Sequence, residues 1–190
     1  MSNEAALIAT TLQGDTHAFG VLVRRYQDRV FTAVFHVLGD RQEAEDLTQE
    51  AFVSAFVNLA SFQQQSSFYT WIYRIAFNLA ATRRQRRRSF VSLEARRESY
   101  GPEPLDTAEP ADENLFREEQ AAQLRAALAE LPEDFRTILV LRELEGCDYQ
   151  TIAEILSTPV GTVRSRLHRA RLELRSRLQP LQSDHPAPQS

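Results

Sequence analysis

Two helical patterns separated by a very short break lie between Asp148 and Arg177, and no other segment constrains the fold as strongly. The first pattern has apolar residues at positions i, i+3, i+4 and i+7, namely Tyr149, Ile152, Ala153 and Leu156. This spacing predicts a helix with one apolar face. Pro159 ends that helix, because proline lacks a backbone N–H and suits the first turn of a new helix. The segment is therefore a pair of helices joined by a tight turn.

The second helix of the pair has a narrow apolar side and a basic side. At about 100° per residue, its apolar residues share an arc about 80° wide that must face a core. They are Val160, Val163, Leu167, Ala170, Leu174 and Leu178. The exposed residues of its early turns are Thr162, Arg164, Ser165, Arg166, His168 and Arg169. In a helix-turn-helix such residues face base edges in the major groove, so we predict this motif at about residues 148–169.

An ordinary helical hairpin with a solvated basic face is the alternative for this segment. Six arginines fall within residues 164–177, and Glu173 is the only acid among them. This density favours contact with DNA. All 22 basic residues of the chain are arginine, whose planar fork suits phosphates and guanine edges. A GC-rich genome produces the same bias and explains it more simply.

The net charge of −4 conceals an uneven distribution along the 190 residues. Residues 1–88 carry ten arginines against eight acids, residues 89–135 four against twelve, and residues 136–190 eight against six. Two mildly basic blocks therefore flank an acidic connector. We predict an all-α chain of two small helical domains. Their bounds are 1–88 and 112–179, with a flexible acidic linker at 89–111 and a disordered tail at 180–190.

The first block, residues 1–88, is predicted to form a compact helical bundle. Helical spacing of apolar residues starts after Gly14 and ends at Gly39, and Asp40 with Glu43 has the spacing of a capping box for a helix to about Asn58. We expect that helix to bury Ala44, Leu47, Ala51 and Ala55, with Phe56 as a further candidate. A loop to Ser67 precedes a third helix at 68–88. No segment shows the alternation of a sheet. In the second block we expect helices at 112–129 and from Pro132 to near Gly146.

Two surfaces of the first block stand out. The second helix places Glu43, Asp46 and Glu50 on one face, which is either a solvated acidic face or a docking surface for a basic partner helix. The third helix starts with aromatic residues and ends with arginines, a pattern in which rings receive splayed bases and arginines hold the backbone. Trp71 belongs to this pattern and also has the spacing of a core residue.

Other chemistry finds no support in the sequence. The four histidines are scattered, no nucleophile elbow, phosphate loop or zinc motif occurs, and a di-iron bundle would need a Glu-x-x-His motif. We expect no enzyme activity, no cofactor and no metal. Cys147 is the only cysteine and reads as a small buried residue. The chain lacks a signal peptide pattern and a long apolar run, so we expect a cytoplasmic protein without membrane insertion.

Taken together and in this order, these segments resemble the bacterial RNA polymerase sigma factors of the extracytoplasmic-function (ECF) group. The similarity covers almost the whole chain. The motifs EDLTQEAF, TWIYRIAFNLA and PVGTVRSRLHRAR carry it, and they are specific in combination. The resemblance implies a promoter-recognition subunit that binds core RNA polymerase and promoter DNA. Members of this family are often held inactive by an anti-sigma factor, which is a further expected partner.

The resemblance also implies roles for particular residues. The helix that docks on the coiled coil of the polymerase β′ subunit would use Asp46, Leu47, Gln49, Glu50 and Phe52. The −10 element would be recognised and opened by Asn58, Phe62, Ser67, Phe68, Trp71, Arg74, Asn78, Arg83 and Arg84. The helix-turn-helix would read the −35 element with the six residues given above, and its domain would also touch the β flap.

Two departures and two alternatives accompany this interpretation. Tyr69 and Phe77 stand where the family more commonly has arginine or another polar residue, and the loop Ser61–Gln65 lacks the usual charge. These departures fall in elements that would read the −10 sequence. One alternative, an adaptor of helical bundles that does not bind DNA, is disfavoured by the two arginine clusters. The other is a stand-alone helix-turn-helix regulator, which would bind duplex DNA without polymerase and usually dimerise. No dimerisation helix or ligand domain is visible in the sequence, and the acidic face would remain unexplained.

Overall fold

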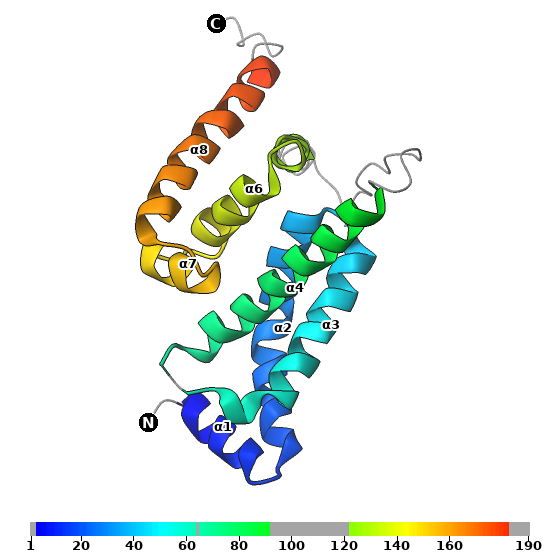
Figure 1. The fold of residues 1–190 in the computed structure, drawn as a ribbon, viewed down its shortest axis with the longest axis vertical. Helices are drawn as coiled ribbons and strands as arrows, with labels where there is room; N and C mark the ends of the chain where they lie inside the picture. The colour runs from blue at the N-terminus through cyan, green and yellow to red at the C-terminus, as the bar shows by residue number, and fades with distance from the viewer. Residues whose placement is uncertain (1–2, 64, 92–121, 183–190) are drawn as a thin grey trace, which may run out of the picture.

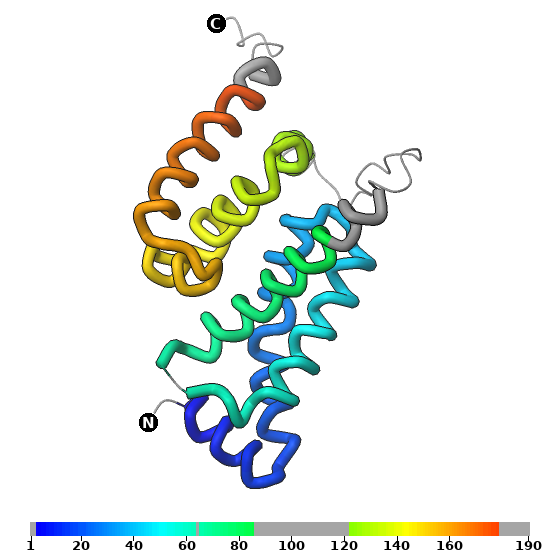
Figure 2. The backbone as a smooth tube through the Cα atoms, in the orientation of Figure 1, coloured from blue at the N-terminus to red at the C-terminus, as the bar shows by residue number. Residues whose placement is uncertain are grey.

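The computed structural model describes residues 3–63, 65–91 and 122–182, and it describes side chains for 3–63, 65–85 and 122–178. Every regular element in these ranges is helical, which confirms the predicted all-α class. Figures 1 and 2 show the arrangement. The elements are α1 (Asn3–Leu12), α2 (Thr16–Leu38), α3 (Arg41–Val57), η1 (Leu59–Ser61), α4 (Phe68–Val91), an unlabelled helix at 122–129, α6 (Glu133–Leu139), η2 (Val140–Leu144), α7 (Tyr149–Ile155) and α8 (Val160–Gln182).

Helices α2, α3 and α4 form the predicted bundle, and α1 crosses one end of it (Figure 1). The predicted helix ends are confirmed. Asp15 caps α2 by accepting a hydrogen bond from the His17 amide at 2.9 Å, and Gly39 ends α2 with φ of 77°, a left-handed conformation that glycine adopts without strain. The Asp40 side chain accepts from the Glu43 amide at 2.7 Å and so caps α3.

Helix α1 was not predicted, because its apolar pattern is short. It contributes only Ile8 as a buried large side chain, although Leu7 packs partly against the same core. Polar contacts also hold it in place. The Tyr26 hydroxyl donates to Glu4, and Arg25 lies 3.6 Å from the same carboxylate. Burial, followed by the hydrogen bond to Glu4, raises the pKa of Tyr26 to about 12, so its hydroxyl remains a neutral donor.

The C-terminal part contains the predicted helix-turn-helix. Asp148 caps α7 through the Thr151 amide at 2.7 Å, and α8 begins directly after Pro159. Val163, Leu167 and Ala170 are all buried, as the apolar arc of α8 requires. Ahead of the motif, α6 continues into the π-helical turn η2, in which the Glu145 amide bonds to the Val140 carbonyl at 3.0 Å. Gly146 then reverses the chain with φ of 69°.

The limits of the predicted segments differ slightly from those of the helices. Helix α4 continues to Val91 and α8 to Gln182, three residues beyond the expected ends at 88 and 179. The rest of the predicted linker, the start of the helix expected at 112–129, and the tail from 183 onward lie outside the described residues.

The two parts of the chain pack against each other. Figure 1 shows α6 and α7 alongside the bundle, and side chains of both parts belong to one continuous apolar core. Contacts of α7 with α4 and of α6 and η2 with α2 contribute to this packing. Arg136 reinforces it by donating to the Val37 carbonyl at 2.6 Å. Nothing in the sequence pattern predicted this contact.

The Asp40 cap gives a direct test of how α3 is anchored. Replacing Asp40 with alanine leaves the first-turn amides without their acceptor and is expected to lower the free energy of unfolding by about 1 kcal/mol. Asp40→Asn keeps an acceptor oxygen and should retain most of that stability. Urea unfolding followed by circular dichroism measures both variants. Equal losses in the two variants would contradict a capping role.

Candidate nucleic-acid and partner interfaces

Helix α3 presents a continuous outward stripe that changes character along its length. Its N-terminal half is polar and acidic, with Asp46, Gln49 and Glu50 exposed. Its C-terminal half is apolar, with Val53 63% exposed, Phe56 42% and Val57 73%. Spacings of three and four residues place these side chains on one face. An acidic and apolar face of this kind suits a partner helix that combines basic and apolar side chains.

Two of the residues expected on this face lie elsewhere. Leu47 is fully buried and Phe52 is 6% exposed, so both belong to the core of the bundle. A partner cannot contact them without unpacking α3, and they hold the helix rather than form its outer surface. The exposure of Val53 and Val57 was not predicted, and Phe56, a candidate for burial in the sequence, is instead exposed. Their helical spacing from Asp46 and Glu50 was the signal that could have identified them.

The loop before α4 and its first turn gather aromatic rings. The Phe62 and Trp71 rings lie 4.9 Å apart between centroids at an interplanar angle of 37°, and Trp71 is half-buried. Phe68 lies 5.9 Å from Trp71 and is only 1% exposed. Phe68 is therefore a core residue that supports the other two rings, whereas Trp71 has both a packed side and an exposed side.

A small pocket of about 120 Å³ opens beside this aromatic group. Its lining comes from α1, the loop and the start of α4, and consists of Glu4, Ala5, Ile8, Phe62, Ser66, Ser67 and Phe68. The Ser67 hydroxyl also accepts a hydrogen bond from the Thr70 amide at 3.1 Å and so caps α4. The pocket combines an aromatic wall, hydroxyl groups and one carboxylate, which are the groups that can hold a planar polar ring.

The remaining residues expected to contact the −10 element are spread along α3 and α4. Asn58 ends α3 with its side-chain amide donating to the Ser54 carbonyl at 2.8 Å, and Asn78 is exposed on α4. Arg83 forms an ion pair with Glu50, which ties α4 to the acidic stripe of α3. Arg74 and Arg84 instead face the C-terminal part of the chain. The side chains of the arginines at 86–88 lie outside the described residues.

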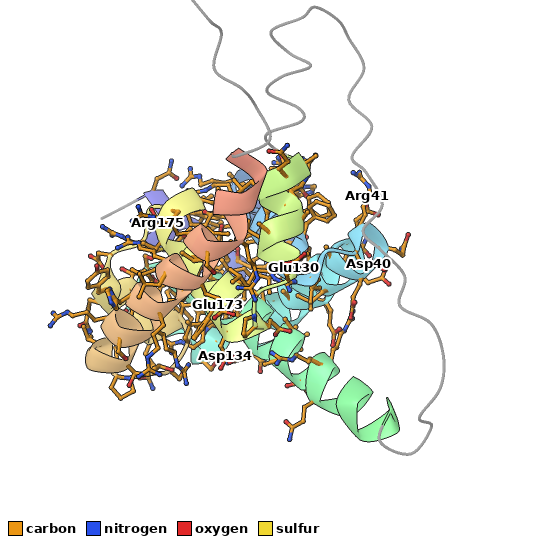
Figure 3. All side chains as sticks on the ribbon, turned by 90° about the horizontal axis from the view of Figure 1, so that it is seen from above. Asp40, Arg41, Glu130, Asp134, Glu173 and Arg175 are labelled. Atoms are coloured by element: carbon orange, nitrogen blue, oxygen red, sulfur yellow. The ribbon has the colours of Figure 1, made fainter. Side chains whose placement is uncertain are left out.

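The early turns of α8 present the face that the sequence predicted. Arg164, Ser165, His168 and Arg169 are exposed, while Thr162 and Arg166 are half-buried. The Ser165 hydroxyl donates to the Thr162 carbonyl at 3.1 Å. Arg166 lies 3.9 Å from Asp134, a residue that Figure 3 shows on the side of α6 near α8. Because the opposite side of α8 is buried, this basic face can enter a groove of DNA without disturbing the core.

Within the described residues, no group of three or more histidine, cysteine or acidic side chains is placed to hold a metal ion. No described helix is both long and apolar enough to cross a membrane. Cys147 is buried, and burial raises the pKa of its thiol. The fold and its exposed faces thus define a helix-turn-helix DNA-binding protein joined to a helical bundle with an exposed acidic and apolar stripe.

Comparison with known proteins identifies the family. The model for Sigma-70 region 2 matches residues 22–90, and the model for Sigma-70, region 4 matches residues 121–174. The RNA polymerase sigma-H factor of Pseudomonas aeruginosa is 41% identical over 180 residues, covering 92% of this chain and 93% of its own length. The ECF RNA polymerase sigma-E factor of Escherichia coli K12 is 39% identical over 185 residues, covering 94% and 95%.

Solved structures agree on the fold. The sigma factor RpoE, in its complex with the anti-sigma factor NepR from Bartonella quintana, has a TM-score of 0.69 at 23% identity, covering 85% of this chain and 96% of RpoE. CnrH, in complex with the cytosolic domain of CnrY, has a TM-score of 0.67 at 23% identity, covering 97% and 100%. The chain belongs to the ECF group of RNA polymerase sigma factors. It directs core polymerase to specific promoters, where transcription starts.

Because Leu47 is buried and Val53 is exposed, their substitutions should differ in their effect on the stability of the fold. Leu47→Ala removes a fully buried side chain and is expected to lower the free energy of unfolding by about 2–5 kcal/mol. Val53→Ala, on the exposed side of the same helix, should change it by less than about 0.5 kcal/mol. Urea unfolding measures both. A small change for Leu47→Ala would place that side chain on the surface after all.

Proposed function

We propose that the outward stripe of α3 is the surface that docks on the coiled coil of the polymerase β′ subunit. The observation that carries this proposal is the continuity of exposed acidic and apolar side chains from Asp46 to Val57. Exposed apolar side chains at the centre of a contact supply most of its affinity, and the acidic ones orient a basic partner. Leu47 and Phe52 serve this surface indirectly, since their burial fixes the helix against the bundle.

We assign recognition of the −10 element to the loop around Phe62 and the outer side of α4. Promoter opening requires bases to leave the stack, and an enzyme or binding protein holds such bases by stacking and by contacts to their edges. The Phe62–Trp71 pair offers the stacking surface, and the adjacent 120 Å³ pocket offers Ser66, Ser67 and Glu4 to a base edge. Arg74, Asn78 and Arg84 then lie further along α4 for the backbone.

We assign recognition of the −35 element to the exposed face of α8. Arg164, Ser165, His168 and Arg169 occupy its early turns, which is where a helix-turn-helix contacts bases. Arg166 and Thr162 lie at the edge of this face. The domains then have separate tasks, with residues 1–88 for polymerase docking and the −10 element and residues 112–179 for the −35 element and the β flap.

The same proposal covers partners and location. A sigma factor acts where promoter DNA and core polymerase are, so we place this chain in the cytoplasm. It needs no catalytic residue of its own, because the polymerase forms the phosphodiester bonds. The RpoE structure named above is a complex with an anti-sigma factor, and a protein of that kind is a further partner that we propose for this chain.

Run-off transcription with sigma-free core polymerase tests the docking stripe. Asp46→Arg reverses an exposed charge at the N-terminal end of the stripe and is expected to abolish promoter-specific transcripts without altering the circular dichroism spectrum. Glu45→Arg is the matched control, because Glu45 pairs with Arg41 at 3.0 Å on the flank of the stripe. Asp46 is preferable to Glu50, whose ion pair with Arg83 also joins α3 to α4.

The result also separates the two classes of protein considered for this chain. Discrete transcripts that depend on Asp46 but not on Glu45 support the docking surface. Full activity of Asp46→Arg would refute the role given to this stripe. Tight binding of the chain alone to duplex promoter DNA would instead favour a stand-alone regulator.

A base-reading arginine of α8 should affect one position of the −35 element. Arg164→Ala is expected to cost about 1–3 kcal/mol on the preferred promoter and to relax discrimination at a single base pair. Arg175→Ala removes an exposed arginine three turns further along α8 and should weaken binding of all sequences alike. Holoenzyme binding to promoters substituted at each −35 position distinguishes these patterns. Uniform weakening by Arg164→Ala would reassign that residue to a phosphate contact.

A further inference from the structure

We propose that Leu172 of α8 is a specificity-determining residue for the −35 element and contacts the C5-methyl group of a thymine in the major groove. This inference rests on the role proposed above for the exposed face of α8. It adds one apolar contact to a face whose other members are basic or polar. The evidence is the place of Leu172 on the helix, the side chains around it and the spacing that it completes.

Leu172 points away from the core of the C-terminal part. It is 56% exposed, whereas Val163, Leu167 and Ala170 of the same helix are at most 1% exposed. At about 100° per residue, Leu172 lies about 180° round the helix from Val163. Figure 1 shows α8 along the outer edge of the C-terminal part, and α6 packs on its inner side. The leucine therefore lies on the side of α8 that would meet DNA.

The neighbours of Leu172 on this face are basic or polar. His168 and Arg169 lie one helical turn before it, Arg175 and Ser176 lie one turn after it, and all four are exposed. A single exposed leucine is common on protein surfaces and needs no partner. A leucine among exposed basic side chains differs, because those charges favour an anionic partner such as DNA over a basic or purely apolar one.

The adjacent arginine, Arg171, is held against the C-terminal part instead of covering the leucine. It donates from Nε at 3.0 Å and from a terminal nitrogen at 2.6 Å to the same carboxylate oxygen of Glu143 in η2. Two donors on one carboxylate fix the guanidinium against η2. At this level of α8, Leu172 rather than Arg171 is therefore presented to the groove.

Leu172 also completes a spacing that recognition helices use. Ser165, His168, Arg169 and Leu172 stand at i, i+3, i+4 and i+7, and all four are exposed. The base-contacting residues of the homeodomain recognition helix have the same spacing. At 1.5 Å per residue the span from Ser165 to Leu172 is about 10.5 Å, within the major-groove width of about 12 Å. Arg175 lies about 15 Å from Ser165, beyond that width, which suits a phosphate contact.

The chemistry of the leucine side chain restricts what it can read. Leucine neither donates nor accepts a hydrogen bond, so packing it over an amino or carbonyl group of a base would leave that group without a partner. The C5-methyl group of thymine is the apolar group that base pairs present in the major groove, and apolar side chains contact it there. We therefore expect Leu172 to favour thymine at one position of the −35 element.

A methyl scan with the holoenzyme tests this contact. On a promoter found by run-off transcription, each thymine of the −35 element and its flanking base pairs is replaced in turn by deoxyuridine, which pairs alike but lacks the methyl group. We expect one replacement to weaken binding of the unaltered holoenzyme about fourfold, the effect of exposing one methylene-sized group. The same replacement should have almost no effect with Leu172→Ala, because the partner of the methyl group is then absent.

Two further variants serve as controls. Leu172→Met keeps an apolar side chain of similar volume and should retain most of the methyl dependence. Leu144→Ala removes another exposed leucine, 51% exposed and next to Glu143, and should leave the methyl dependence unchanged. Because Leu172 is exposed, Leu172→Ala should fold normally, which a thermal melt checks.

The scan has clear contrary outcomes. No methyl dependence in the unaltered holoenzyme, or a dependence that Leu172→Ala leaves intact, would overturn the proposal. Equal weakening of thymine and deoxyuridine promoters by Leu172→Ala would also overturn it and would assign the leucine to a protein contact. The Arg164→Ala experiment tests the wider role of α8 separately. If Arg164→Ala relaxes discrimination at one base pair while the methyl scan fails, the proposed function stands and only the role of Leu172 is refuted.

Discussion

The packing of α4 is the constraint on which the rest of the structure depends. One side of this helix carries Phe68, Ile72 and Ala76 into the core of the bundle. A second side meets α7, where Arg74 donates to the Glu154 carbonyl. What remains is a narrow surface near Trp71 and Asn78. Because a helix has only one circumference, the core and the C-terminal part leave only this surface of α4 open to other partners.

Helix ends and the buried side of each helix could be predicted from the sequence, because they depend on neighbouring residues. Gly39 and Asp40 mark a helix end and a helix start through backbone conformation and capping, which neighbouring residues decide. The arc of α8 was equally predictable, since a helix with Val163 and Leu167 on one side must bury that side. For the same reason the basic face containing Arg164 and Arg169 was assigned correctly to the exposed side of the helix.

Features that depend on contacts between distant segments could not be predicted from the sequence. The apolar spacing predicted the burial of Leu47. Phe52, however, shares a family motif with exposed Asp46 and Glu50, and neither the motif nor the spacing assigned it to the core. Helix α1 depends on the contact of Glu4 with Tyr26, twenty-two positions away, rather than on its own pattern. The cluster of Arg29, Tyr69 and Glu145 joins residues up to 116 positions apart, and no periodicity reveals such a meeting.

The polar chemistry of the contact between the two parts limits how much that contact stabilises the chain. Glu145 loses water when the parts meet, and its bonds to Arg29 and Tyr69 replace that hydration rather than add greatly to it. Arg29 and Arg84 keep part of their exposure to solvent, which limits the strength of their ion pairs. These polar contacts therefore add little to the stability of the contact between the two parts.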